Sequence, residues 1–397
     1  MKRILFLGAA PTQIPPIRYA LAQGHYVITC DYLPSNPGHR LAHEWHNVST
    51  TDKDAVLDLA RNLAIDGIVA YASDPSAPTG AYVAEHLGLP GNPYQAVLTL
   101  ARKDLFRRFL SENGFNVPRS GSFYSLQEAI DWASTVNLPV FVKPIDSSGS
   151  KGLTFVNHLS DLEKAFDYAQ SFSREKVVVI EEQIEKSGYQ IDSDVFMVDG
   201  KLQFWQWGDQ HQDPVCNPYA PISSSYPSII DHDIGLEAAR QVERLLNSLS
   251  FKRGAFNVEF LVDINKRIWI LEIGARNGGK NIPIAIKYAT GVDLIKYTVD
   301  AALGEDCSNL SNAPVKGFWS NYTIHSRATG TFKDLWISNR AQNNIVEQHL
   351  WIKPGQTVMK YRSSSDTLGT MIMRYDSMEQ MLEMTDNMEK DVRVIVE

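Results

Sequence analysis

Residues 253–283 read RGAFNVEFLVDINKRIWILEIGARNGGKNIP, and the interpretation of the whole chain begins from this stretch. Two runs rich in β-branched and aromatic residues, 255–262 and 268–273, flank a polar turn and predict a β-hairpin. A turn centred between residues 265 and 266 places Glu259 directly opposite Glu272. Facing like charges repel, and a carboxylate among apolar neighbours is costly unless a cation binds it. Because Mg²⁺ is commonly held by one or two carboxylates and by phosphate oxygens, the hairpin predicts one wall of a nucleotide-phosphate site.

The segment after the second strand favours an anion. Gly274, Gly278 and Gly279 precede a helical pattern over 281–288, and glycines before a helix leave backbone N–H groups free for an anion. Arg276 adds a fixed positive charge. The alternative is an ordinary hairpin with two solvent-facing glutamates, but the paired acids, the arginine and the glycines together favour a site.

Composition restricts the class of protein. The chain has 397 residues, 44% of them hydrophobic and 21% charged, which indicates a globular protein of two or three domains. The net charge of −8 argues against nucleic acid as a partner. The three cysteines, Cys30, Cys216 and Cys307, are far apart and suggest a reducing compartment. No segment has the apolar length of a signal peptide or a membrane helix, so we expect a soluble, cytoplasmic protein with no membrane partner.

Residues 1–120 alternate strand and helix patterns, which is typical of a doubly wound parallel sheet. Such a sheet often binds NAD, and Asp31 ends the second predicted strand, where a ribose-binding acid would lie. However, the first loop, GAAPTQIPP, lacks the GxGxxG spacing that lets a pyrophosphate approach. We therefore favour a structural role for this loop over an NAD site.

The middle of the chain holds further candidates for phosphate and base contacts. Lys143 ends an apolar strand just before Pro144, where a cation must find an anion or water. The segment 146–152, DSSGSKG, is a run of small residues between two strands that could fold over a phosphate chain. Lys103, in a helical pattern over 94–114, resembles a surface lysine when judged alone. Residues 181–185 follow a strand and could receive an adenine through backbone groups.

Two later segments complete the pattern. Residues 208–228 are predicted to form a long loop, which in a compact domain is usually functional, and its aromatic and hydroxyl residues favour substrate contact. The helix predicted over 377–388 carries four methionines at helical spacing, which indicates a core stripe.

Taken in order, these residues resemble the ATP-grasp superfamily of carboxylate-amine ligases, which includes carbamoyl-phosphate synthases and L-amino acid ligases. The resemblance covers nearly the whole chain and implies an α/β and α+β fold. It implies four parts: a Rossmann-like domain over 1–115, a small ATP-grasp subdomain over 116–187, a large subdomain with the metal site over 188–310, and a C-terminal α/β extension over 311–397.

The resemblance also implies a role for each matching residue, with ATP and Mg²⁺ (or Mn²⁺) as cofactors. Lys103 and Lys143 would contact the phosphates, beneath a flexible loop that contains Ser147, Ser148, Gly149, Ser150 and Lys151. The adenine would be received by Glu181, Glu182 and Ile184, and the metal by Glu259 and Glu272. Arg276 would hold the substrate carboxylate or stabilise an acyl phosphate.

The sequence departs from the family pattern at two positions. Many members have Asn two residues after the second metal glutamate, where this chain has Gly274, so we expect this metal contact either to be missing or to come from elsewhere, from Asn257 or Asn277. The acid that usually binds the ribose aligns with Gln190, so either Glu185 replaces it or the ribose contact is weaker.

The implied reaction converts a small-molecule carboxylate into an acyl phosphate, which an amine then attacks to form an amide. His211, with Asp213 as a second choice, is the candidate proton acceptor for the amine and completes a catalytic set with Lys143 and Arg276. One alternative is a carboxylating or formylating ATP-grasp enzyme that uses bicarbonate or formate. Another is a non-catalytic nucleotide-binding regulatory protein. Members of the superfamily are often homodimers.

Overall fold

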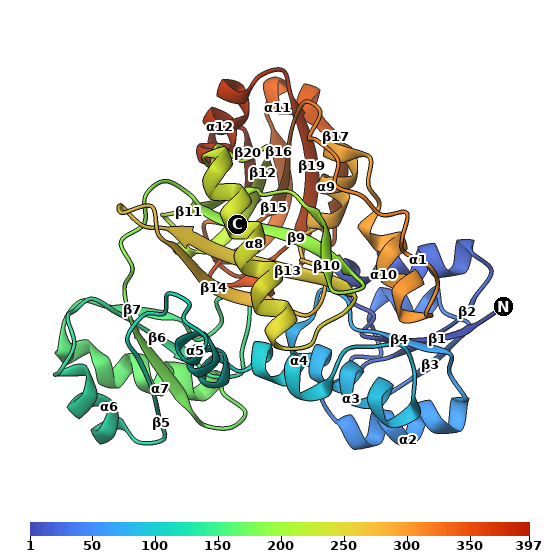
Figure 1. The fold of residues 1–397 in the computed structure, drawn as a ribbon. Coiled ribbons are helices and arrows are strands. Elements are labelled where there is room, and N and C mark those ends of the chain that lie inside the picture. The colour runs from blue at the N-terminus through green and yellow to red at the C-terminus, as the bar shows by residue number, and fades with distance from the viewer.

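The structure is a computed structural model that describes all 397 residues. Its N-terminal part, blue in Figure 1, is a parallel four-stranded sheet with the strand order β3-β2-β1-β4, as the alternating pattern predicts. The strands are β1 (Arg3–Leu7), β2 (Tyr26–Cys30), β3 (Glu44–His46) and β4 (Gly67–Val69). The helices are α1 (Ile14–Ala22), α2 (Lys53–Leu63), α3 (Ala77–Leu87), α4 (Tyr94–Ala101) and α5 (Lys103–Glu112).

The side chain of Gln13 fills the loop after β1. Its Nε2 donates to the carbonyl oxygens of Leu7 and Tyr71 at 3.1 and 3.2 Å, and its Oε1 accepts from the backbone N–H of Ala10 at 2.8 Å. In a dinucleotide site the backbone groups of this loop would face the ligand. Here the side chain of Gln13 forms their hydrogen bonds instead.

A smaller antiparallel sheet follows, with the order β5-β8-β6-β7. Helices α6 (Leu126–Ala133) and α7 (Leu162–Phe172) pack on it around a separate apolar core. This unit lies apart from the N-terminal sheet, at the lower left of Figure 1. Its strands are β5 (Ser120–Phe123), β6 (Val140–Pro144), β7 (Thr154–Val156) and β8 (Val178–Glu182).

The centre of the molecule is a nine-stranded sheet with the order β14-β13-β9-β11-β12-β15-β19-β17, to which β10 adds by pairing with β9. The strands from the middle of the chain are β9 (Gln190–Val198), β10 (Lys201–Trp205), β11 (Asp209–Asp213), β12 (Asn217–Tyr226), β13 (Gly254–Val262) and β14 (Ile268–Gly274). Three helices accompany them: α8 (His232–Ser248), α9 (Ile282–Thr290) and α10 (Leu294–Ala302).

The prediction of a loop over residues 208–228 is wrong. This segment supplies β11 and β12, two inner strands of the large sheet. The strands were missed because their side chains are polar yet buried, as at Gln210 and Ser225, and are bonded to neighbouring strands instead of alternating with apolar ones.

The hairpin β13–β14 has the facing register that the sequence predicts, since Glu259 pairs with Glu272. This pairing depends on a β-bulge, because Phe260 pairs with Ile270 and leaves Leu271 without a partner. The carbonyl of Leu271 instead accepts from Arg107 Nη1 at 2.8 Å. Without the bulge, the register of the outer hairpin would place Leu271 opposite Glu259.

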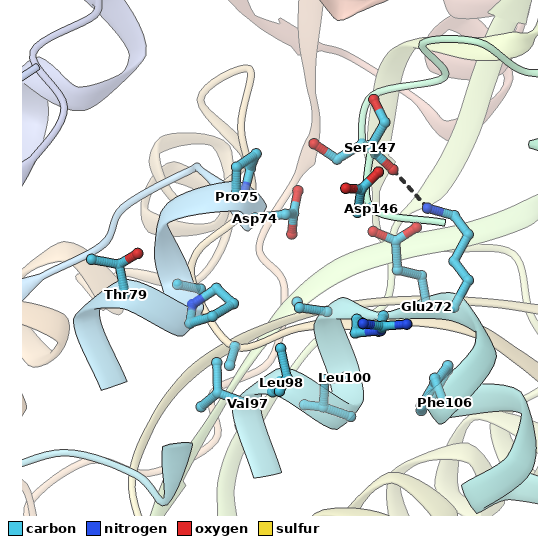
Figure 2. Close-up of a pocket in the computed structure, with 18 of the residues that line it drawn as sticks. Asp74, Pro75, Thr79, Val97, Leu98, Leu100, Phe106, Asp146, Ser147 and Glu272 are labelled. Carbon is cyan, nitrogen blue, oxygen red and sulfur yellow. Dashed lines mark hydrogen bonds between the residues drawn. The ribbon is translucent and has the colours of Figure 1, made fainter. Parts of the chain in front are cut away.

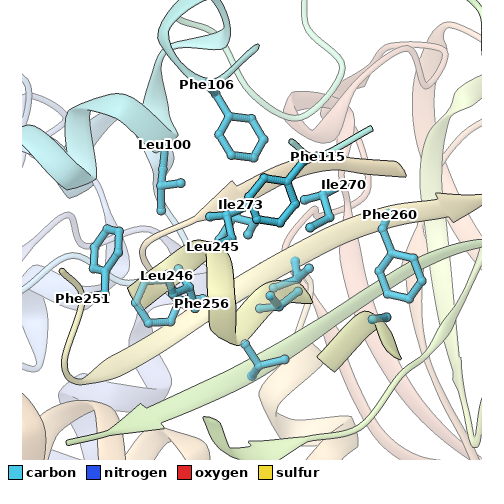
Figure 3. Packing of buried hydrophobic residues seen from close by; sticks show 14 of the residues in the cluster. Leu100, Phe106, Phe115, Leu245, Leu246, Phe251, Phe256, Phe260, Ile270 and Ile273 are labelled. Atoms are coloured by element: carbon cyan, nitrogen blue, oxygen red, sulfur yellow. The ribbon is translucent and has the colours of Figure 1, made fainter. Parts of the chain in front are cut away.

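The two faces of the hairpin have different surroundings. Alternate residues such as Phe256, Phe260 and Ile273 enter the largest apolar core, where helices α4, α5 and α8 cover them (Figure 3). Because strand side chains alternate, the glutamates project from the opposite face. The apolar face fixes the hairpin and thereby the direction of both carboxylates.

The C-terminal residues, orange to red in Figure 1, extend the large sheet. Strands β15 (Phe318–Ile324), β19 (Gly369–Tyr375) and β17 (Ile345–Leu350) continue it, and β16 (Gly330–Ile337), β18 (Thr357–Val358) and β20 (Val392–Val396) form a small sheet beside it. Two helices, α11 (Asn339–Asn344) and α12 (Met378–Asp386), complete the region. Met381, Met384 and Met388 are buried, which confirms the core stripe. No helix is both long and apolar enough to cross a membrane.

Candidate active site

A cavity of about 620 Å³ lies where the small sheet, the hairpin and the C-terminal region meet. Fourteen of the predicted site residues line it: Lys103, Lys143, Ser147, Ser148, Gly149, Ser150, Lys151, Glu181, Glu182, Ile184, Gln190, Glu259, Glu272 and Arg276. A second cavity of about 210 Å³ adjoins it and shares Asp74, Ser147 and Glu272 among its lining residues. Figure 2 shows these three residues around this second space. The fold thus gathers residues from segments far apart in the sequence.

Three carboxylates form a row across neighbouring strands on the cavity side of the sheet. Glu259 of β13 pairs with Glu272 of β14 on one side and with Asp192 of β9 on the other. Burial, together with repulsion from Asp192 and Glu272, raises the pKa of Glu259 well above its usual range. Gln190 Nε2 donates to Glu259 Oε2 at 3.0 Å and leaves the negative charge of the row uncompensated.

These groups suit a hard divalent cation. Glu259 and Glu272 offer carboxylate oxygens, and Gln190 offers an amide oxygen beside them, whereas Asn257 Oδ1 already accepts from Arg276 Nη1. An oxygen-only donor set that keeps room for water and phosphate is the environment that Mg²⁺ prefers. The raised pKa of Glu259 is the sign of a buried acid whose charge requires a counter-ion. The residues present therefore fit a magnesium site.

Arg276 is held by an acid from the N-terminal part. Its Nε and Nη2 each donate to an oxygen of Asp74 at 2.7 Å, and its Nη1 donates to Asn257 Oδ1 at 2.8 Å. Gly274 makes this arrangement possible, because a Cβ atom there would lie 2.6 Å from Asp74 Oδ1. The position where many family members have an asparagine is thus occupied by the Asp74–Arg276 ion pair.

Lys143 belongs to a buried network around Glu181. Lys143 Nζ donates to Glu181 Oε2 at 2.5 Å, and Arg107 Nε donates to Glu181 Oε1 at 2.9 Å. Burial alone would raise the pKa of Glu181, but Arg107 and Lys143 lower it to about 2. Burial also lowers the pKa of Lys143. The network leaves one excess positive charge at the wall of the cavity, which suits a nucleotide.

The loop over 146–152 is bonded to three other parts of the chain. Lys103 Nζ donates to the carbonyl of Ser147 at 2.6 Å, as the dashed line in Figure 2 marks. Ser150 Oγ donates to the carbonyl of Tyr219 at 2.9 Å, and the Ser364 N–H donates to the carbonyl of Gly149 at 3.1 Å. Lys103 occupies this place because the helix predicted over 94–114 breaks at Arg102, which is extended, and a new helix starts at Lys103.

The structure places His211 away from the cavity, which contradicts its assignment as a catalytic residue. The side chain is fully buried on the other side of β11. Its Nδ1 bonds Asp386 Oδ1 at 2.7 Å and its Nε2 bonds Ser225 Oγ at 2.9 Å. Gln210 and Gln212 face the cavity instead, because strand neighbours point to opposite sides. Asp213 is also turned away, in an ion pair with Arg327.

Two other expectations also require correction. Glu185 is exposed and does not line the cavity, so it is not positioned to replace an acid at Gln190. Of the two asparagines considered for the metal, only Asn257 lines the cavity. Asn277 is buried, and its Oδ1 accepts from Thr298 Oγ1 at 2.8 Å.

Sequence reasoning missed five charged residues that the fold brings to the cavity: Asp74, Arg107, Lys186, Asp192 and Lys280. Arg107 left a detectable signal, because it lies between Phe106 and Leu110 on the apolar side of α5, where a charge must have a partner. The sequence signal at Asp192 is weaker: it is an acid within an otherwise buried strand. Asp74 had no local signal, because only the fold brings it to Arg276.

The comparisons with known proteins agree with this geometry. Residues 108–280 match the ATP-grasp domain, and residues 323–397 match the L-amino acid ligase C-terminal domain 2. The fold is similar to that of an L-amino acid ligase from Bacillus licheniformis, with a TM-score of 0.83 and 19% identity over 100% of this chain and 99% of that one. It is also similar to a phosphoribosylglycinamide synthetase from Anaerococcus prevotii, with a TM-score of 0.76 and 19% identity over the whole of both chains.

Curated relatives have similar sequences. A formate-dependent phosphoribosylglycinamide formyltransferase from Thioalkalivibrio sulfidiphilus is 27% identical over 290 residues, which are 69% of each chain. The carbamoyl phosphate synthase large chain from Pseudothermotoga lettingae is 23% identical over 78% of this chain, which spans only 29% of that longer protein. The fold and the site thus define an ATP-grasp protein. The chain contains an ATP-grasp domain and an L-amino acid ligase C-terminal domain, and its homologues indicate an ATP-dependent ligase.

Proposed function

We propose that this enzyme joins a small-molecule carboxylate to an amine through an acyl phosphate, with release of ADP and phosphate, and that one of its substrates is an amino acid or a sugar acid. The observation that carries the proposal is the facing pair Glu259 and Glu272 in one cavity with Lys143 and the 147–151 loop. A carboxylate becomes a good acceptor for an amine only after activation, and phosphorylation by ATP supplies it.

Each part of the cavity has a separate task in this reaction. Lys103, Lys143 and the N–H and O–H groups of 147–151 would position the phosphates, and the segment 181–184 would receive the adenine. Glu259 and Glu272 would hold Mg²⁺ or Mn²⁺, which neutralises charge on the transferred phosphoryl group. Catalysis of this kind consists mainly of positioning and electrostatic stabilisation.

Arg276 would hold the substrate with what remains of its hydrogen-bonding capacity. A guanidinium has five N–H groups. Four of them donate within the protein, to Asp74, to Asn257 and to the backbone carbonyl of Asn277. One Nη2 hydrogen therefore remains for a carboxylate or acyl-phosphate oxygen, on a side chain that is already fixed in place.

A second candidate function is transfer of a formyl or carboxyl group. The formyltransferase relative, at 27% identity, favours it. Two observations favour amide formation: the match of residues 323–397 to the L-amino acid ligase C-terminal domain 2, and the contribution of that region to the cavity through Trp351, Ser364, Ser365 and Thr367. A cavity of about 620 Å³ also has room for more than a nucleotide and a one-carbon acid.

The proposal is tested by a screen of carboxylates and amines for ADP release, with hydroxylamine present in a parallel series. Acid-dependent hydroxamate with ADP would demonstrate the acyl phosphate, and mass spectrometry of the amine reactions would identify an amide. Formylated or carboxylated amine would support the second candidate. ADP release without hydroxamate or amide for any acid would contradict the proposal.

A pair of charge-matched variants makes this test specific. Glu272→Gln should lower kcat by at least roughly 100-fold, because it removes one proposed metal ligand. Glu185→Gln removes the same charge from an exposed position outside the cavity and should leave kcat unchanged. Equal activity of the two variants would count against the metal assignment.

A further inference from the structure

Asp192 is the cavity carboxylate for which the proposed chemistry has no task. It is 5% exposed, lines the cavity and projects from β9 between two different surroundings. On one side lies β13 with Glu259, its register partner. On the other side lie β11 and β12, which supply Gln210 and Ser224. Asp192 thus marks the border between the proposed metal site and a polar wall.

No cation of the protein neutralises Asp192. Asp74 and Glu181, two other acids of the cavity, are each paired with arginine or lysine, whereas Asp192, like the proposed metal ligands Glu259 and Glu272, forms no ion pair. Its Oδ1 accepts from Asn257 Nδ2 at 2.8 Å, while Gln210 Nε2 and Ser224 Oγ both lie 3.5 Å from Oδ2. Oδ2 therefore has only contacts at the limit of hydrogen bonding.

The two nearest cations are engaged elsewhere. Arg276 is bonded to Asp74 through two N–H groups. Lys280 Nζ donates to the carbonyl of Pro221 and to the hydroxyl of Tyr361. Burying a carboxylate without a counter-ion costs free energy, so we expect a positively charged group of a ligand to neutralise the charge of Asp192.

We propose that Asp192 binds the α-ammonium group of the carboxylate substrate and so selects an α-amino acid over a sugar acid or a plain carboxylic acid. This inference rests on the proposed function. Neighbouring strands lie about 4.8 Å apart, so Asp192 is one strand spacing from Glu259. In an α-amino acid, a single carbon joins the ammonium to the carboxylate. A carboxylate activated beside Glu259 therefore places its ammonium at Asp192, between Oδ2 and Ser224 Oγ.

The test compares acids that differ only in the α-ammonium group, using hydroxamate formation with MgATP as the assay. L-Alanine is paired with propionate, and L-leucine with 4-methylpentanoate. Wild-type enzyme should prefer the amino acid of each pair. Asp192→Asn should lower kcat/KM for the amino acids by roughly 30- to 1,000-fold, as expected for loss of a buried charge pair, and should leave the plain acids unaffected. The preference within each pair should disappear.

Three results would overturn the inference. The first is hydroxamate formation by wild-type enzyme with no preference within either pair. The second is a decrease in kcat/KM, from wild type to Asp192→Asn, that is equal for both acids of a pair. Such a decrease would indicate a metal or structural role for Asp192. The third is unchanged amino acid binding to Asp192→Asn in calorimetry with MgADP present. If Asp192→Asn does not fold, Asp192→Ser is measured in the same way. Absence of hydroxamate from every acid would instead contradict the proposed function.

Discussion

Replacement of Gly274 by alanine tests the link between the N-terminal part and the active site. The added Cβ would lie 2.6 Å from Asp74 Oδ1 and 3.0 Å from Nε and Cζ of Arg276. Ordinary contacts between such atoms are about 3.5 Å, so the ion pair must move by roughly 1 Å. The backbone itself allows alanine, because Gly274 does not have a positive φ. Any effect of Gly274→Ala therefore comes from the ion pair.

The expected magnitude follows from the burial of the pair. The side chains of Asp74 and Arg276 are 19% and 9% exposed, so little water can replace their hydrogen bonds. Overpacking a buried position costs about 1–3 kcal/mol of unfolding free energy. A displacement of about 1 Å at a positioning residue can lower activity by about 100-fold. We therefore expect a lower midpoint of thermal unfolding and a kcat/KM for the acid substrate reduced by about 10- to 100-fold.

Gly279→Ala is the matched control, because no atom lies within 4 Å of a Cβ at that position in the same segment. A double-mutant cycle with Asp74→Ala separates the clash from other effects. Gly274→Ala should destabilise the Asp74→Ala variant much less than it destabilises the wild type, because the carboxylate that the new Cβ would meet is then absent. The reasoning is refuted if Gly274→Ala and Gly279→Ala have the same unfolding midpoint, or if the two changes in the cycle are additive.

Three further variants test other parts of the site. His211→Gln should lower the thermal midpoint but leave kcat/KM near the wild-type value; a large loss of kcat in folded protein would restore a catalytic role. Burial raises the pKa of Asp194 to about 7, so the folded chain holds a proton that the unfolded chain loses near pH 4. Its contribution to stability is therefore complete below pH 4 and is lost as pH rises to about 7, by at most about 1.4 kcal/mol per pH unit. Denaturation of Asp194→Asn across this range should show a shallower decline, and an unchanged slope would contradict the assignment. Arg107→Met should cost about 3–5 kcal/mol and weaken ADP binding, because Glu181 keeps only Lys143. Calorimetry that gives an unchanged Kd for ADP would argue against the network.

Local patterns predicted the hairpin and the parallel N-terminal sheet because both have strong local signals. Two apolar runs around a polar turn specify a hairpin, and the apolar face of β13 and β14 fixes the side on which Glu259 and Glu272 lie. The bulge at Leu271 was not predictable in this way, because Arg107, 164 residues away, satisfies its carbonyl. The facing register was right because the turn position assumed from the sequence compensated for the unseen bulge.

The errors come from polar residues inside the large sheet. Burial of Gln210, His211 and Ser225 depends on partners from other strands and from α12, so their segment has the composition of a loop. The same distance in sequence concealed Asp74, which meets Arg276 across 202 residues. The order of the family motifs along the chain identified many of the residues that line the cavity. Only the fold shows which of these residues form ion pairs within the protein.

Binding of Mn²⁺ in the presence of ADP tests the central claim most directly, because it measures the metal at the hairpin without requiring the substrates. Electron paramagnetic resonance would give the number of Mn²⁺ ions bound per chain for wild type, Glu259→Gln, Glu272→Gln and the Glu185→Gln control. The account predicts that both hairpin variants fold, bind ADP and lose Mn²⁺, whereas the control matches wild type. Undiminished Mn²⁺ binding in both hairpin variants would contradict it.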